Sequence, residues 1–98
     1  MEKKVVFLSK STDAFIQEEA SRSALGSMLK GHEPSLMILD EEFDISKEDV
    51  EENLEWMVDD GLVVSNNPAN VEKSEYISEM SIEDMAKKML EYEVIIPY

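Results

Sequence analysis

Few residues of this 98-residue chain are suited to covalent or metal chemistry. It contains no cysteine, which excludes disulfides, thiolate metal sites, cysteine nucleophiles and persulfide carriage by this chain. The one histidine, His32, cannot supply a zinc cluster, and because it follows Gly31 in a predicted turn we expect it at the surface. We therefore predict no catalytic residue, no metal ion and no cofactor, and that the chain alone is not an enzyme. A small hydrolase or transferase with an unrecognised site stays an alternative.

Phosphate chemistry is disfavoured by the residues that follow the first apolar run. Loops that cradle phosphates need glycines, because the backbone must approach the anion closely. Here the segment from Ser9 to Asp13 reads SKSTD and has no glycine. A Rossmann or Walker type of nucleotide site is therefore not expected.

Polar residues stand directly after three short apolar runs. If these runs are parallel strands, their carboxyl ends meet at one edge of the sheet, where ligands bind in open α/β folds. The sequence predicts either a small polar pocket there or ordinary capping and turn residues. The candidates for this pocket are Ser9, Ser11, Asp40, Ser65, Asn66 and Asn67.

The net charge of −14 is concentrated in one segment. Residues 40–60 contain eleven acids and a single base, Lys47. Nucleic acids are bound by neutralising phosphates with Lys and Arg, so direct nucleic-acid binding is not expected. The acidic run is either a solvated face or a surface that binds a partner.

Composition favours one folded, non-membrane domain spanning residues 1–98. Apolar residues make up 43% of the chain, too many for a disordered acidic tail. No run approaches the roughly 18 apolar residues of a membrane span. The apolar run near the N-terminus is too short for a signal peptide, and no small-residue cleavage site follows it. We therefore expect a cytoplasmic protein.

Short β-branched and apolar runs alternate with longer helical patterns. Buried strands are predicted at Lys4–Ser9, Ser35–Leu39, Leu62–Ser65 and Val94–Ile96. A short fifth strand at Tyr76–Met80 is compatible with the pattern. The residues His32 to Pro34 are expected to form a break before the second strand.

Helices are predicted between these strands. The first runs from Thr12 or Asp13 to Lys30, with apolar residues around more than half of its circumference. A second begins at Ser46, which forms a near capping box with Asp49, and ends at Gly61.

The second half of the chain continues the helical pattern. The second helix is expected to face the core with an apolar stripe made of Val50, Leu54, Met57 and Val58. The sequence is also compatible with a short helix at Asn70–Ser74. The last helix begins after Ser81, which pairs with Asp84 in a second near capping box.

This alternation predicts an α/β fold. A parallel sheet needs right-handed crossovers, which place helices on its faces. We expect three layers, α/β/α, around a small, mainly parallel sheet of four or five strands.

The order and spacing of these elements resemble the DsrE/DsrF/DsrH-like (TusB/TusC/TusD-like) superfamily of sulfur-relay proteins. Three segments carry the resemblance: KVVFLSKSTDAFIQEEASRSALGSMLKGHEPSLMIL at 4–39, NLEWMVDDGLVVSNN at 53–67 and SIEDMAKKMLEYEVIIPY at 81–98. It implies a DsrE/F-like fold over nearly the whole chain. It also implies assembly into dimers, trimers or hexamers.

The chain departs from that family at one position. In the sulfur-carrying members, the strand matched by Leu62–Ser65 ends in a cysteine that bears the persulfide, and here Ser65 stands there. A serine hydroxyl cannot hold a sulfane sulfur. The resemblance therefore implies a cysteine-free, non-catalytic subunit that serves assembly or has an accessory role in tRNA thiolation or sulfur oxidation.

Association is also indicated by apolar residues that one core does not account for. Trp56 falls outside the apolar stripe of the second helix, and the first helix carries more apolar surface than one sheet face covers. Aromatic residues of this kind are enriched at interfaces. Trp56, Phe15, Leu25 and Leu29 are the candidate interface residues, and the expected partner is a second copy or a homologous subunit.

A different reading treats residues 41–64 as part of a winged helix-turn-helix, with DDGLVV at the start of the wing. The would-be recognition helix is strongly acidic, so such a domain would bind protein or mimic nucleic acid. A parallel sheet would exclude the wing.

Overall fold

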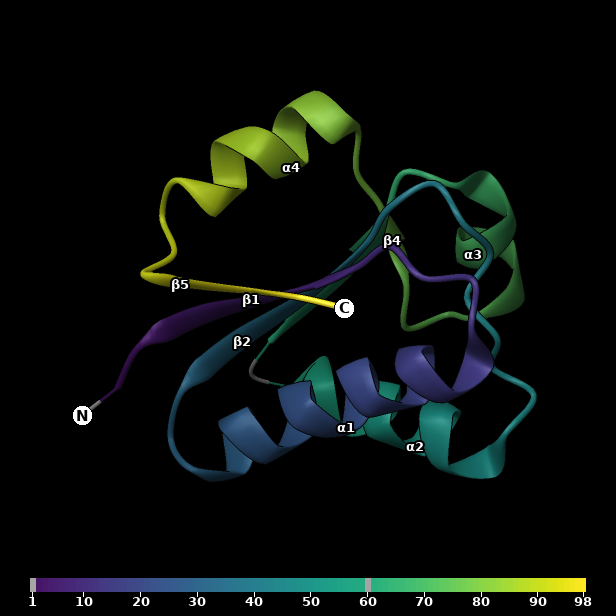
Figure 1. Ribbon diagram of the computed structural model, residues 1–98, viewed down its shortest axis with the longest axis horizontal. Coiled ribbons are helices and arrows are strands. Elements are labelled where there is room, and N and C mark those ends of the chain that lie inside the picture. Colours follow the sequence, from purple (N-terminus) through teal and green to yellow (C-terminus); the bar gives the residue numbers. More distant parts are fainter. Residues whose placement is uncertain (1, 60) are drawn as a thin grey trace.

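A sheet of five parallel strands forms the middle layer of the molecule (Figure 1). The computed structural model describes residues 2–59 and 61–98. The strand order is β4-β3-β2-β1-β5, and each neighbouring pair is parallel. The strands are β1 (Lys4–Ser9), β2 (Glu33–Ile38), β3 (Leu62–Ser65), β4 (Ser78–Glu79) and β5 (Val94–Pro97). The predicted parallel sheet is confirmed, and the short additional strand predicted at Tyr76–Met80 is β4, which covers only Ser78–Glu79.

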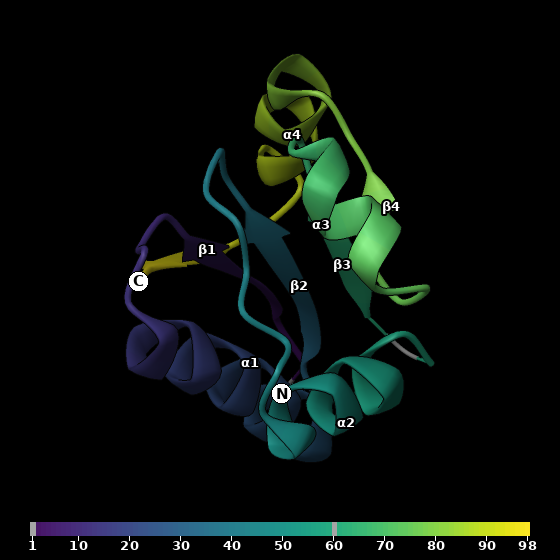
Figure 2. The same cartoon turned by 90° about the vertical axis from the view of Figure 1, so that its right-hand side faces the viewer.

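Helices cover both faces of this sheet, as predicted. They are α1 (Ala14–Leu29), α2 (Glu48–Met57), α3 (Pro68–Lys73) and α4 (Ile82–Met89). Figure 1 shows α1 and α2 together on one face and α4 on the opposite face. The short helix α3 follows β3 directly and lies beside β3 and β4 (Figure 2). The three layers of an α/β/α fold are therefore present.

The apolar side chains of the strands alternate between two cores, because successive residues of a strand point to opposite faces. Val5 and Phe7 of β1 belong to the core under α1 and α2. Val6 of β1 belongs to the smaller core under α4, together with Met37, Val64 and Met85. This explains why the strands read as unbroken apolar runs, since both of their faces are buried.

The buried face of α1 is not its most apolar one. It consists of Gln17, Ala20, Ser21 and Ala24, which follow the helical spacing i, i+3, i+4, i+7. Because these residues are small or polar, the positions of the large apolar residues in the sequence do not reveal this buried face. The large residue Phe15, a predicted interface residue, lies on the exposed side.

The start of α2 was predicted at Ser46, and this is wrong. The N-cap residue is Lys47, and it makes no side-chain capping bond. Asp44 explains the difference, because its Oδ1 accepts the Ser46 backbone N–H at 2.8 Å and draws Ser46 into a turn. The equivalent prediction for α4 is confirmed, since Ser81 Oγ accepts the Asp84 backbone N–H at 3.1 Å.

Two further boundaries are corrected. Helix α2 ends at Met57 rather than near Gly61, and Val58, predicted in the core stripe, is 39% exposed. Gly61 instead closes the turn that follows, by donating its N–H to the Met57 carbonyl at 2.7 Å. Helix α3 begins at Pro68, earlier than predicted, because Asn67 caps it with a hydrogen bond from the Ala69 N–H at 2.9 Å.

The second strand begins at Glu33, so the predicted break at Pro34 is also wrong. The N–H groups at the two ends of β2 are directed to β1: Glu33 N–H donates at 2.9 Å to the carbonyl of Lys3, just before β1, and the N–H of Leu39, just after β2, donates to the Ser9 carbonyl. Pro34 falls between them, on the side of β3. The ladder with β3 begins only at Ser35, so the missing N–H of Pro34 is not needed.

The winged-helix alternative is contradicted by the topology. Its wing requires β3 to form an antiparallel hairpin with the next segment, whereas β3 pairs in parallel with β4 after α3. Residues 35–38, which would have to be helical, lie in the middle of the sheet.

Candidate functional site

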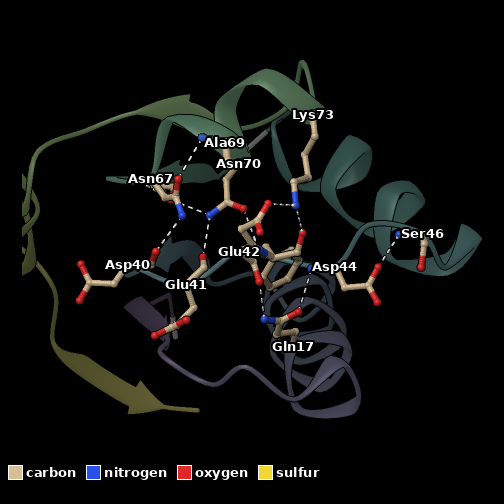
Figure 3. A network of polar contacts seen from close by, with 12 residues as sticks. Gln17, Asp40, Glu41, Glu42, Asp44, Ser46, Asn67, Ala69, Asn70 and Lys73 are labelled. Carbon is tan, nitrogen blue, oxygen red and sulfur yellow. Dashed lines mark hydrogen bonds and ion pairs between the residues drawn. The ribbon is translucent and has the colours of Figure 1, made fainter.

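Three residues predicted at the strand ends meet as expected, but they bond to one another. Asp40 N–H donates to Asn66 Oδ1 at 2.7 Å, and Asn66 Nδ2 donates to Asp40 Oδ1 at 2.8 Å. Asn67 Nδ2 donates to the Asp40 carbonyl at 2.8 Å (Figure 3). Asp40 itself has a φ of +58°, a left-handed conformation that Asp tolerates better than most residues. The group joins the end of β2 to the turn after β3.

Ser65 is fully buried at the end of β3, and its hydroxyl has three partners. It donates to the Ile38 carbonyl at 2.9 Å, and it accepts from Asn67 N–H at 3.1 Å and from Asn70 Nδ2 at 3.0 Å. The hydroxyl therefore links β2, β3 and α3. In this position it is a structural group with no access to solvent.

The two remaining predicted residues do not join this group. Ser9 is buried, and its hydroxyl has no hydrogen-bond partner among the described residues. Ser11 Oγ accepts the Asp13 backbone N–H at 3.0 Å in the turn before α1. The six candidates are therefore not all brought together: Asp40, Ser65, Asn66 and Asn67 share one hydrogen-bonded group, and Ser9 and Ser11 lie outside it.

Two buried amides at this edge of the sheet were not predicted. Asn70 Oδ1 accepts the Phe43 N–H at 2.7 Å, and Asn70 Nδ2 also donates to the Glu41 carbonyl at 2.9 Å. Phe43 is fully buried. Asn70 thus holds the β2–α2 loop (residues 39–47) from the side of α3.

Gln17 of α1 holds the same loop from the other side (Figure 3). Its Nε2 donates to the Ser11 and Glu42 carbonyls at 2.8 and 2.9 Å, and its Oε1 accepts the Asp44 N–H at 2.8 Å. Local sequence says little about Gln17, because its loop partners Glu42 and Asp44 are more than twenty positions away. The place of a polar residue in the Gln17, Ala20, Ser21, Ala24 row is the one clue.

Charged residues complete the anchoring of the β2–α2 loop. Lys73 Nζ donates to the Phe43 carbonyl at 3.0 Å and lies 3.5 Å from Glu42 Oε1. Hydrogen bonds from the Ser46 hydroxyl and backbone N–H hold the pKa of the Asp44 carboxyl below its ordinary value of 3.8. Within residues 2–59 and 61–98, no group of three or more Asp, Glu or His side chains is placed to hold a metal ion.

The predicted interface residues are mostly exposed. Phe15 and Leu29 on α1 are 71% and 72% exposed, and Trp56 on α2 is 54% exposed. Leu25 is only half-buried and packs against the core, so it contributes less to the outer surface. Lys47 Nζ lies 3.8 Å from the centre of the Phe15 ring, a cation–π contact that links the start of α1 to the start of α2.

Trp56 borders an acidic hollow on the outer side of α2. This hollow, of about 510 Å³, is also lined by Glu48, Glu51, Glu52, Glu55 and Asp59. Such a surface is unfavourable for an anion and for nucleic acid. Trp56 is therefore an apolar side chain on a surface that is otherwise acidic.

Comparison with protein-family models, with curated proteins and with solved structures finds no match to this chain. In the described part of the chain, no helix is long and apolar enough to cross a membrane.

Proposed function

We propose that this chain is a non-catalytic subunit that acts by binding other protein chains, either copies of itself or homologous subunits. The observation that carries the proposal is the exposure of Phe15, Leu29 and Trp56 on the outer surface of α1 and α2. Aromatic residues such as Phe15 and Trp56 are enriched at protein–protein interfaces relative to the rest of the surface. The resemblance to the DsrE/DsrF/DsrH-like superfamily supports an assembly or accessory role in a sulfur-relay system.

The polar edge of the sheet also supports a binding role rather than turnover by this chain. The side-chain hydrogen-bonding groups of Ser65, Asn67 and Asn70 are engaged with neighbouring residues. A substrate would have to break these bonds to reach them. Since the chain has no cysteine, we expect incubation with a cysteine desulfurase and labelled cysteine to leave it unlabelled.

Charge makes the proposed self-association dependent on salt. Each copy brings a net charge of −14, so two copies repel each other at low ionic strength. In 0.1 M salt, the repulsion between exposed charges is largely screened beyond about 10 Å, and this distance becomes shorter as the salt concentration rises. Self-association should therefore strengthen with salt, whereas binding of a basic partner should weaken.

Sedimentation velocity at several salt concentrations tests the proposal. Wild type is expected to self-associate at high micromolar concentration in about 0.5 M salt, where the Debye length is only a few ångströms. A Leu29→Ser, Trp56→Ser double variant should shift the protein to monomer. Leu90→Ser is the matched control, because Leu90 is 87% exposed at the C-cap of α4, and α4 lies across the sheet from α1 and α2. A strict monomer under these conditions, with no homologous subunit copurifying, would contradict the proposal.

A further inference from the structure

A second hollow lies between the C-terminal half of α1 and the strands β1 and β5. We call it the α1–β5 groove; its volume is about 490 Å³. Val5 and Phe7 of β1 and Val94 and Ile96 of β5 form its apolar floor. Ligand sites for small molecules commonly have volumes of roughly 300–1,000 Å³ and apolar linings. The groove has the size and the floor of such a site.

The topology explains why this space is open. Strand β5 is an edge strand, and α1 packs over β1 and β2 rather than over β5. The α1-facing side chains of β5 are therefore only half-buried. Gly26 on the wall of the groove adds room, because a Cβ at this position would have no atom within 4 Å.

The two ends of the groove differ. Near one end, Tyr98 contacts two lining residues: its hydroxyl donates to Ser23 Oγ at 2.7 Å, and its ring centre lies 6.3 Å from that of Phe7. The other end lies where α1 finishes and β1 begins. Lys3, Lys30 and His32 line this end, which we call the basic rim.

Every charged residue that lines the groove is basic. The whole chain has 23 acids and only 9 Lys and Arg residues, so an all-basic lining is unexpected for a hollow placed at random. Among the described residues, neither Lys3 nor Lys30 forms an ion pair. The acids Glu2 and Glu33 lie beside His32 but line a different hollow.

Hydrogen bonding at the basic rim also favours an anion. His32 Nδ1 accepts the Lys3 backbone N–H at 3.1 Å, so the neutral ring carries its proton on Nε2 as a donor. Free backbone carbonyls at the C-terminus of a helix such as α1 ordinarily repel an anion. Here the Ser27 and Met28 carbonyls already accept the backbone N–H groups of Lys30, Gly31 and His32 at 3.0–3.1 Å.

We propose that the α1–β5 groove binds a small free anion with a short apolar chain, of the medium-chain carboxylate type. The head group lies at the basic rim and accepts hydrogen bonds from Lys3, Lys30 and His32, while the chain covers Val94 and Ile96. This site is separate from the proposed subunit interface on α1 and α2, and neither proposal depends on the other.

Decanoate, kept below its micelle concentration, is the probe. In a titration followed by amide chemical shifts, we expect saturable changes at Ser23, Gly26, Val94 and Ile96. Decyltrimethylammonium has the same chain and a cationic head, so it should bind at least about tenfold more weakly. Trp56 does not line the groove, and its fluorescence should not change with decanoate.

Two sets of variants test the two parts of the groove. Gly26→Leu should fill the groove and abolish decanoate binding while the Tm stays equal or rises, and Gly26→Ala should raise the Tm but keep most binding. The Lys3→Gln, Lys30→Gln double variant should lower affinity about tenfold. The Lys10→Gln, Lys87→Gln double variant is the matched charge control, because both lysines are exposed and lie outside the groove.

Several results would overturn the proposal. These are no saturable binding of decanoate, equal affinity for the two head groups, or undiminished binding by folded Gly26→Leu. If Gly26→Leu fails to fold, the lysine double variant decides alone. A dimer that forms without decanoate and disappears in Gly26→Leu would show that a second copy occupies the groove instead.

Discussion

The side-chain amide of Asn70 donates a hydrogen bond to the Ser65 hydroxyl at 3.0 Å, and both side chains are fully buried. Through this contact the end of β3 is tied to α3. Because Asn70 also bonds Glu41 and Phe43, the same side chain fixes the β2–α2 loop. Stability at this edge of the sheet therefore depends on one amide with three partners.

Replacing Asn70 by Ala should destabilise the protein by about 2–4 kcal/mol. The change leaves the Phe43 N–H and the Glu41 carbonyl without this partner, and a buried polar group left unsatisfied costs about 1–3 kcal/mol. Urea denaturation measures the loss. Asn66→Ala is the control, since Asn66 is only half-buried and water can replace its bonds. Equal losses in the two variants would show that burial of Asn70 does not set the cost.

A Ser65→Cys variant should place its thiol out of reach of solvent. Ser65 has no exposed surface, and a thiol is a weaker hydrogen-bond partner than a hydroxyl. We expect a loss of stability of about 1–2 kcal/mol. In the native protein, the thiol should react with a thiol reagent, or take up label from a cysteine desulfurase, only as fast as local unfolding exposes it. Rapid stoichiometric labelling without denaturant would mean that the end of β3 is accessible.

The Asp44 carboxylate should contribute to stability at neutral pH and lose that contribution in acid. Its folded pKa is lowered by hydrogen bonds from Ser46, so its contribution is present above the unfolded value of about 3.8 and is lost as pH falls through the lower folded value. Between pH 4.5 and 2.5, wild type should therefore lose more stability than Asp44→Asn, which cannot titrate. NMR titration of the Asp44 carboxyl provides the direct check, and a midpoint at or above 3.8 would contradict the assignment.

Much of the fold could be predicted because its strands are buried on both faces. Leu62–Ser65 was predicted with its observed bounds, since a short apolar run with two valines between Gly61 and Asn66 has few alternatives. The start of α4 followed from the Ser81 cap, which depends only on residues within one turn. Features set by local sequence were therefore recovered.

Features that depend on residues far away in the sequence were not recovered. Gln17 and Asn70 look like ordinary polar residues until the fold brings the β2–α2 loop between them. The strand-end residues were correctly predicted to approach one another in part, but the pattern could not show that Asp40, Asn66 and Asn67 satisfy one another's hydrogen bonds. The cap at Ser46 failed for a related reason, because Asp44 competes for the same backbone N–H.

Repulsion between carboxylates on the outer face of α2 should lower the stability of the protein. Its last turn has no basic residue, and Glu55 stands three or four residues from Glu51, Glu52 and Asp59. Glu55→Lys relieves this repulsion and places a cation near the helix C-terminus, so we expect a gain of about 0.5–1 kcal/mol at low salt. Urea denaturation at low salt and in about 1 M salt should show the gain shrinking with screening.

The control for this effect is Glu48→Lys, at the first residue of the same helix. There the new cation lies near the positive end of the helix dipole, which offsets the relief of repulsion, so a smaller gain or a loss is expected. Equal gains at both positions would mean that net charge alone, without the helix dipole, accounts for the result.

Gly26 and Gly61 should respond to alanine in opposite directions. At Gly26, within α1, an added Cβ meets nothing within 4 Å, so Gly26→Ala should stabilise the protein by about 0.5–1 kcal/mol through helix propensity. At Gly61, a Cβ would lie 2.8 Å from the Pro34 carbonyl oxygen and 2.9 Å from that of Met57. Both are backbone atoms that cannot rotate away.

Gly61→Ala must therefore push the turn after α2 away from β2, and we expect a loss of about 1–3 kcal/mol. Since about 1 kcal/mol shifts the Tm of a domain of this size by about 4–8 °C, thermal melts followed by circular dichroism resolve both changes. The two variants add the same methyl group, so their opposite signs isolate the effect of local space. A Gly61→Ala variant as stable as wild type would mean that the close approach of Gly61 to Pro34 does not hold in solution.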